Sequence, residues 1–162
     1  MSSLSTPANA PIRVLFLCTG NSARSQMAEA FLRHYGGGRF APESAGTLLS
    51  PAINPLAITV MDQISLPLAG QYPKTLDALM ARGTTWDYVI TTCDEVKEDC
   101  PTFPGDTERI HWNFDDPARA EGTPEQRLRA FRRVRDEIKR RVQLFTALSV
   151  HHRAAAAPQA EY

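Results

Sequence analysis

One cysteine in this chain of 162 residues is followed by residues that suit the binding of an oxyanion. Cys18 precedes a short polar loop, and Arg24 and Ser25 come after five intervening residues. In a loop between a strand and a helix, successive backbone N–H groups can turn inward and form a concave anion site. Gly20 allows a tight turn, and the guanidinium of Arg24 can hold two oxygens of a tetrahedral anion. The predicted oxyanion cradle consists of Thr19, Gly20, Asn21, Ser22, Ala23 and Arg24.

The same surroundings predict that Cys18 is a nucleophile. The N–H dipoles, the helix N-terminus and Arg24 favour the thiolate, and such surroundings can lower a cysteine pKa from about 8.5 into the range of roughly 3.5–7.5. The hydroxyl of Ser25 can donate a further hydrogen bond to the sulfur. A thiolate beneath a bound oxyanion is placed for in-line attack. The alternative is a buried cysteine without chemistry, which the spacing between Cys18 and Arg24 argues against.

Two further cysteines, Cys93 and Cys100, are separated by the strongly polar residues 94–99. An odd total of 3 cysteines and the lack of a signal-peptide pattern argue against a structural disulfide framework. Catalytic or redox use is favoured. One alternative is a zinc site, although four Cys or His ligands at suitable spacing are not evident. The other is a pair of cysteines with no shared role.

A strand, a loop and a helix are predicted around Cys18. Residues 12–17 form an apolar run typical of a buried strand, and from Ser25 the apolar residues take helical spacing until Gly36. Further strands are predicted at 40–45, 86–92 and 109–112, the first of them at a sheet edge because it contains Pro42. Helices are predicted from Asn54, from Thr75 and from a capping box at 123–126, the last one with an apolar stripe that runs to Leu148.

This order of elements predicts a single α/β domain with a central parallel four-stranded sheet and helices on both faces. In such sheets ligands bind at the carboxyl ends of the strands. Cys18 and Cys93 each follow a predicted strand, so we expect both thiols at the same edge of the sheet. We expect the domain to cover residues 11–149, after a disordered leader at 1–10 and before a tail at 150–162.

Residues Phe16 to Ala30, with the sequence FLCTGNSARSQMAEA, resemble the phosphate loop of the low-molecular-weight tyrosine phosphatase fold. More narrowly, they resemble the thioredoxin-coupled arsenate reductases built on that fold, over roughly residues 12–148. The resemblance implies reduction of arsenate to arsenite in arsenic detoxification. Cys18 would attack arsenate, Cys93 would attack the sulfur of Cys18 and release arsenite, and Cys100 would then form a disulfide with Cys93. Thioredoxin is the expected reductant, with glutaredoxin or a low-molecular-weight thiol as the alternative.

The resemblance also assigns a proton donor to Asp116, which stands immediately before Pro117. In tyrosine phosphatases of this fold an aromatic residue usually follows this Asp-Pro pair, whereas Ala118 stands here. The missing ring favours a small inorganic substrate. Phosphate and sulfate are expected to compete with arsenate because they are tetrahedral oxyanions too. His111 and Trp112, which also match the reductases, are interpreted as structural.

Some reductases of this type bind a potassium ion beside the loop. Asn21, Glu29 and Ser44 match three of its side-chain ligands, but Lys74 takes the place of the fourth, an aspartate. Its ammonium can replace the cation electrostatically. We therefore expect no potassium requirement, no other metal and no cofactor. Ala23 stands where several relatives carry another cysteine, which the relay does not use.

The composition argues against two other classes of partner. With 18 basic and 18 acidic side chains, the net charge is zero and recruits neither nucleic acid nor anionic membrane. A solvated face is the favoured interpretation of the basic last helix, which carries Arg127, Arg129, Arg132, Arg133, Arg135, Lys139, Arg140 and Arg141. The absence of a signal peptide or a membrane-length apolar run predicts a cytoplasmic protein. A low-molecular-weight phosphatase and a non-enzymatic sensor of oxyanions or arsenite remain as alternative functions.

Overall fold

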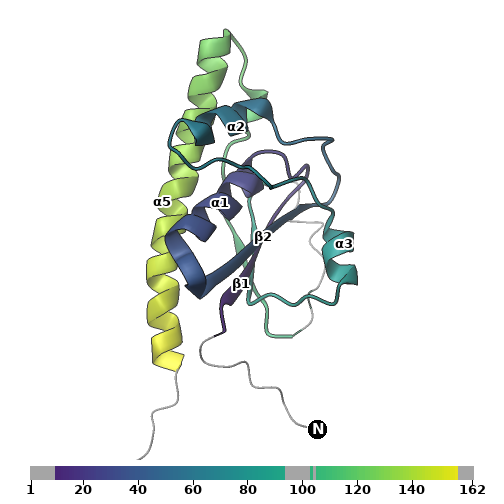
Figure 1. The fold of residues 1–162 in the computed structure, drawn as a ribbon, viewed down its shortest axis with the longest axis vertical. Helices are drawn as coiled ribbons and strands as arrows, with labels where there is room; N and C mark the ends of the chain where they lie inside the picture. Colours follow the sequence, from purple (N-terminus) through teal and green to yellow (C-terminus); the bar gives the residue numbers. More distant parts are fainter. Residues whose placement is uncertain (1–9, 94–102, 104, 157–162) are drawn as a thin grey trace, which may run out of the picture.

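The computed structural model describes residues 10–93, 103 and 105–156, with the backbone alone for residues 150–156 (Figure 1). Within this part, four strands form one parallel sheet in the order β2-β1-β3-β4. The strands are β1 (Ile12–Cys18), β2 (Phe40–Gly46), β3 (Tyr88–Thr91) and β4 (Glu108–His111). The predicted parallel sheet is confirmed, and β2 lies at the edge expected from Pro42.

Three of the helices begin at the residues that the sequence predicts, which are Asn54, Thr75 and Thr123. Asn54 Oδ1 accepts a hydrogen bond from the Leu56 N–H at 2.9 Å. In the capping box, the Thr123 N–H donates to Gln126 Oε1 at 2.8 Å, and the Gln126 N–H donates to Thr123 Oγ1 at 3.1 Å. The described helices are α1 (Arg24–Gly36), α2 (Pro55–Asp62), α3 (Leu76–Ala81) and α5 (Pro124–Ala156), with 3₁₀ turns η1 (Gly37–Arg39) and η2 (Pro117–Arg119).

Strand β1 separates two hydrophobic cores because its side chains alternate between the two faces of the sheet. Val14 and Phe16 belong to the larger core, together with residues of α1, α2 and α5. Leu15 and Leu17 belong to the smaller core, together with residues of α3. Figure 1 shows α1 and the long α5 on one side of the sheet and α3 on the other. Helices therefore cover both faces, and Cys18 lies at the carboxyl end of a deeply buried strand.

Helix α5 differs from its prediction at its end and on its basic face. Its backbone is helical to Ala156. Leu148 is 59% exposed, so the apolar stripe ends before it. Arg135 is buried and donates a hydrogen bond to Val60 O at 2.8 Å, so it joins α5 to α2 instead of lying on a solvated face. The predictions that Leu148 belongs to the buried stripe and that Arg135 lies on a solvated face are wrong, because helical spacing does not show where the neighbouring helices lie.

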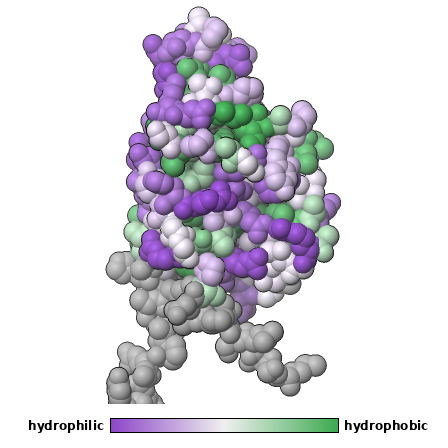
Figure 2. Space-filling model, in the orientation of Figure 1, coloured by the Kyte–Doolittle hydropathy of each residue, from purple (hydrophilic) through white to green (hydrophobic). Residues whose placement is uncertain are grey.

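The surface is mixed in hydropathy. Figure 2 shows hydrophilic residues over most of one face and a group of hydrophobic residues in its upper part, near α2. No helix in the described part of the chain is long and apolar enough to cross a membrane. Beneath the surface, Trp112 is buried with its ring centroid 5.8 Å from those of Phe16 and Phe145, which fits the structural role expected of it.

Candidate active site

The loop between β1 and α1 is fixed by backbone hydrogen bonds to residues 47–54. Four N–H groups in that segment donate to the carbonyl oxygens of Cys18, Thr19, Gly20 and Ser22 at 2.8–3.2 Å. Within a trans peptide unit the N–H points opposite to the C=O. The N–H groups that follow these carbonyls therefore face away from residues 47–54, and that of Asn21 donates to Cys18 Sγ at 3.1 Å. This orientation supports the oxyanion cradle predicted from residues 19–24.

Two glycines leave room for close contacts at this loop, Gly20 for the side chain of Ser50 and Gly46 for the backbone of the loop itself. A Cβ atom at Gly20 would lie 2.5 Å from Ser50 Oγ, which agrees with the need for glycine expected there. A Cβ atom at Gly46 would lie 2.5 Å from Thr19 O and 3.1 Å from Asn21 N. Sequence analysis missed Gly46. The available signal was a glycine directly at the end of a strand, a position that often marks close backbone approach.

The sulfur of Cys18 contacts the hydroxyl of Ser25. The two atoms lie 2.8 Å apart and both residues are buried. Asn21 Nδ2 donates to Ser25 Oγ at 2.9 Å, so the oxygen of Ser25 already accepts a hydrogen bond and its own hydrogen is available for Cys18 Sγ. The network thus orients Ser25 as a donor to the nucleophile, as the sequence predicts.

The pKa of Cys18 differs from the prediction. Burial raises the pKa of this thiol above its ordinary value of 9.0, and the nearby charge of Cys93 raises it further. The hydrogen bonds from Ser25 and Asn21 and the charge of Arg24 lower the pKa, but they do not outweigh burial. The expected depression of the pKa is therefore wrong for this structure. Sequence analysis counted the favourable dipoles and charge but not the loss of solvent around Cys18, a residue that is 4% exposed.

The structure brings Asp116 and Arg24 together. Arg24 Nη1 donates to Phe114 O at 3.0 Å, and Arg24 Nη2 lies 3.8 Å from Asp116 Oδ2. Asp116 Oδ1 accepts a hydrogen bond from the Ala118 N–H at 3.0 Å and caps η2. The loop that carries the predicted proton donor is thus tied to the arginine of the cradle, although the two residues are 92 positions apart in the chain.

Cys93 lies beside the cradle because of the strand register. Leu17 pairs with Thr91, and the Thr92 N–H still donates to Leu17 O at 2.9 Å, so the pairing of β1 with β3 continues past the assigned strands. Thr19 and Cys93 each follow this pair of residues by two positions, and Thr19 Oγ1 lies 3.5 Å from Cys93 Sγ. Cys93 is a buried free thiol, as is Cys18. The expectation that both thiols share one edge of the sheet is met, whereas Cys100 lies outside the described residues.

Asn21 is held by a side chain that sequence analysis missed. Gln26 is fully buried in α1, and its Nε2 donates to Asn21 O and to Asn21 Oδ1, each at 3.0 Å. The Lys74 N–H also donates to Asn21 Oδ1, at 2.9 Å. These contacts leave Asn21 Nδ2 facing Ser25. A polar residue on the buried face of a predicted helix is the signal that could have identified Gln26.

Lys74 lies near the residues matched to potassium ligands. Lys74 Nζ is 3.7 Å from Glu29 Oε1, and Ser44 Oγ donates to the same carboxylate oxygen at 2.8 Å. Glu29 Oε2 accepts a hydrogen bond from Arg33 Nη2 at 2.8 Å. The carboxylate therefore has two cationic neighbours, one of them at the position expected for the ammonium. Among the described residues, no group of three or more His, Cys, Asp or Glu side chains is arranged to hold a metal ion.

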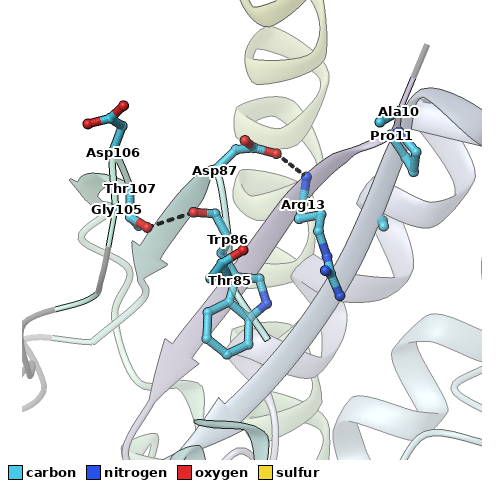
Figure 3. Close-up of a pocket in the computed structure, with 10 residues that line it drawn as sticks. Ala10, Pro11, Arg13, Thr85, Trp86, Asp87, Gly105, Asp106 and Thr107 are labelled. Carbon is cyan, nitrogen blue, oxygen red and sulfur yellow. Dashed lines mark hydrogen bonds between the residues drawn. The ribbon is translucent and has the colours of Figure 1, made fainter. Parts of the chain in front are cut away.

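A cavity of about 740 Å³ lies at the opposite end of the sheet, where the strands begin. Figure 3 shows residues that line it, including Arg13 and Asp87, joined by a hydrogen bond from the Arg13 N–H to Asp87 Oδ2 at 2.8 Å. None of the predicted site residues lines this cavity. The predicted site therefore lies in the cysteine loop at the carboxyl ends of the strands, and this cavity is separate from it.

Comparisons with known proteins identify the family of the chain. Residues 13–154 match the model of the family described as low molecular weight phosphotyrosine protein phosphatase. A curated arsenate reductase of Halalkalibacterium halodurans is 43% identical over 132 residues, which cover 82% of this chain and 93% of that protein.

Two solved structures are also similar. One, described as an arsenate reductase in the phosphate binding state, has a TM-score of 0.66 and 30% identity, and the match covers 84% of this chain and 97% of that one. The thioredoxin-dependent arsenate reductase of Corynebacterium glutamicum has a TM-score of 0.58 and 30% identity. That match covers 83% of this chain and 64% of the other.

Proposed function

Because the chain belongs to the low-molecular-weight phosphotyrosine protein phosphatase family and resembles the arsenate reductases in it, we propose that it reduces arsenate to arsenite with Cys18 as nucleophile. The contact that carries this proposal is the one between Thr19 Oγ1 and Cys93 Sγ, at 3.5 Å. A phosphatase opens its cysteinyl intermediate with water and needs one thiol. Reduction needs a second thiol close to the first, and Cys93 is buried beside the loop of Cys18.

The proposed reaction moves two electrons from sulfur to arsenic. The Cys18 thiol first gives its proton to water, and the thiolate attacks arsenic(V) and forms a sulfur–arsenic bond, while Asp116 supplies the proton with which an arsenate oxygen leaves as water. The Cys93 thiolate then attacks Cys18 Sγ. A Cys18–Cys93 disulfide forms, the electron pair of the sulfur–arsenic bond stays on arsenic, and arsenite departs. Cys100 attacks Cys93 Sγ, which frees the Cys18 thiolate and leaves a Cys93–Cys100 disulfide.

Arg24 and the loop N–H groups hold the oxyanion during these steps. The side chain of Arg24 is 12% exposed, so its interaction with an anion is little weakened by solvent. The cradle recognises a tetrahedral anion, and phosphate and sulfate compete for it. The solved relative in the phosphate binding state supports this part of the proposal. Ala118 leaves no aromatic platform beside Asp116, which favours an inorganic anion over an aryl phosphate.

A protein dithiol, thioredoxin, regenerates the enzyme in this proposal. The solved relative from Corynebacterium glutamicum is described as thioredoxin-dependent, which supports this choice over glutaredoxin or a small thiol. We further propose a role in arsenic detoxification and a cytoplasmic location. The location is supported by the free thiols of Cys18 and Cys93, since a reducing compartment keeps such thiols available.

Separate replacement of Cys93 and Cys100 by serine tests the relay. Each variant should lose multiple-turnover arsenate reduction with thioredoxin and its reductase, because the Cys93–Cys100 disulfide that thioredoxin reduces can no longer form. Hydrolysis of an aryl phosphate through Cys18 should persist at a low rate in both variants. Disulfide mapping of the parent protein after reaction with arsenate should find Cys93 joined to Cys100.

The same two variants distinguish the alternative functions. A phosphatase would hydrolyse aryl phosphate at a rate indifferent to both substitutions and would not reduce arsenate. A sensor would show neither activity. Multiple-turnover reduction that survives in either variant would contradict the three-cysteine relay.

A further inference from the structure

We propose that Gln26 is a positioning residue for Cys18: its buried side-chain amide holds Asn21 in the backbone conformation that directs an N–H group at the nucleophilic sulfur. The proposal rests on the role of Cys18 as nucleophile. Gln26 itself does not contact Cys18 in any hydrogen bond of the described residues, so it acts through Asn21.

Asn21 has a backbone conformation that needs support. Its φ is +53°, in the left-handed region that non-glycine residues adopt at some cost. Asn21 is also fully buried, so each of its polar atoms requires a partner within the protein. In this conformation its N–H donates to Cys18 Sγ at 3.1 Å and its Nδ2 donates to Ser25 Oγ at 2.9 Å. Asn21 makes both hydrogen bonds, one to Cys18 and one to the serine that contacts it. The surroundings of the sulfur therefore depend on the conformation of one residue.

Gln26 supplies partners to both oxygens of Asn21. Its Nε2 donates to the backbone oxygen and to the side-chain oxygen of Asn21, each at 3.0 Å. One amide group therefore bonds to the main chain and the side chain of the same residue. Because Asn21 Oδ1 is held on the side of Gln26, Asn21 Nδ2 must face Ser25. Loss of the Gln26 amide would leave Asn21 O without this donor.

The orientation of the Gln26 amide is fixed from its other side. Gln71 Nε2 donates to Gln26 Oε1 at 2.8 Å and to Gln26 O at 3.0 Å. Tyr72 O lies 3.1 Å from Gln26 Nε2 as a third acceptor, and it shares the two amide hydrogens with the oxygens of Asn21. Because Gln26 Oε1 is occupied by a donor, Nε2 is the atom that faces Asn21. Gln26 thus connects the nucleophile loop to the segment around residues 71 and 72.

A purely packing role does not require this residue type. Methionine has a similar length and would fill the buried position without polar atoms. A buried amide carries a penalty unless it is hydrogen-bonded, and here its bonds go to the residue that directs two donors at the nucleophile and its serine. The difference between glutamine and methionine at position 26 therefore isolates the positioning role.

The test compares three variants in a background in which Cys93→Ser and Cys100→Ser leave Cys18 as the sole thiol. Gln26→Met removes the amide that bonds to Asn21, whereas Gln71→Met leaves that amide in place and removes the donor to Gln26 Oε1 and Gln26 O, together with the acceptor for Arg33 Nη1. Gln63→Met makes the same chemical change at an exposed position and serves as the control. The rate constant for alkylation of Cys18 by iodoacetamide is measured from pH 6 to pH 11, and the melting temperature of each variant is recorded.

We expect Gln26→Met to shift the midpoint of the alkylation profile upward by about one pH unit, since a hydrogen bond to the thiolate is lost. Gln71→Met should shift it in the same direction by less, and Gln63→Met should not shift it. A folded Gln26→Met variant with an unchanged midpoint would overturn the proposal. If Gln26→Met does not fold, an unchanged midpoint in Gln71→Met would overturn it instead. Alkylation does not depend on arsenate, so failure of this proposal is distinguishable from failure of the proposed reductase activity.

Discussion

Lys74 Nζ lies 3.7 Å from Glu29 Oε1, and the two side chains are only 17% and 5% exposed. The same carboxylate accepts a hydrogen bond from Ser44. The main chain of Lys74 contacts the loop that follows Cys18, since its N–H donates to Asn21 Oδ1 at 2.9 Å. One residue therefore delivers a positive charge to a buried carboxylate and a hydrogen bond to the loop of Cys18.

From this ion pair we predict that turnover is independent of potassium. Replacing potassium by a larger organic cation at constant ionic strength should leave kcat for arsenate unchanged, because the ammonium of Lys74 already neutralises Glu29. Lys74→Met should lower the free energy of unfolding by about 1–3 kcal/mol, with Arg33 still pairing with Glu29. Steady-state assays and chemical denaturation measure the two effects. A clear rise in kcat on adding potassium to the parent protein would contradict the prediction.

The pH dependence of the free nucleophile follows from its environment. Burial raises the pKa of Cys18 above 9.0, so the thiolate fraction grows with pH up to and beyond that value. With Cys18 as the sole thiol, its alkylation rate should rise about tenfold per pH unit from pH 7 to pH 9. An alkylation rate that stops rising below pH 8 would show that the pKa of Cys18 is lower than its burial implies.

Ser25→Ala should raise the pKa of Cys18 further, because the hydrogen bond from Ser25 is one of the influences that lower it. The substitution also leaves Asn21 Nδ2 without its acceptor. We expect the alkylation rate at pH 8 to fall by about tenfold and the protein to lose about 1–3 kcal/mol of stability. Stopped-flow alkylation and thermal melts measure these effects, and an unchanged rate would argue against Ser25 as a donor to the sulfur.

Asp116→Asn should lower kcat for arsenate by about 10²–10⁴-fold, the range typical of a lost general acid. The asparagine oxygen can still accept the Ala118 N–H, so the turn at η2 should persist. Asp115→Asn is the matched control, because Asp115 is 81% exposed and pairs with Arg133 on the surface. Equal losses of kcat in the two variants would point to a general effect of charge and not to proton donation.

Gly46→Ala should displace the nucleophile loop. The added Cβ would lie 2.5 Å from Thr19 O, a backbone atom that cannot move without moving the cradle. We expect a loss of arsenate reduction of at least about tenfold and weaker inhibition by phosphate. Gly38→Ala is the control, since a Cβ at Gly38 meets nothing within 4 Å. Inhibition constants for phosphate in the two variants measure the effect, and retention of the parent value in Gly46→Ala would show that the loop adapts.

The sequence predicts those features that depend on residues close together in the chain. The capping box at Thr123 and Gln126, the edge position of β2 and the approach of Cys18 to Ser25 all follow from local spacing or from residue type. Parallel sheet topology adds one long-range prediction. It places Cys93 at the same edge as Cys18, which agrees with the contact between Cys93 and Thr19.

Features that depend on burial or on distant partners are not predicted. The pKa of Cys18 is raised because elements far along the chain exclude solvent from it. Arg135 is buried because α2 lies across its face of α5, a placement that helical periodicity does not contain. The role of Gln26 depends on Gln71, which is 45 residues away. In each case the decisive partner comes from the tertiary structure.

The neighbouring positions of β1 and β3 in the sheet have an evolutionary consequence. Strand β1 ends at Cys18 and β3 leads directly to Cys93, so the two sulfurs that we propose as the attacking thiol and the relay thiol follow neighbouring strands. Strand spacing in a sheet is nearly invariant, so this separation is inherited with the fold and does not have to be selected anew. We therefore expect that substitutions after β3, at Cys93 and beyond, can remove the proposed relay without altering the loop that follows β1.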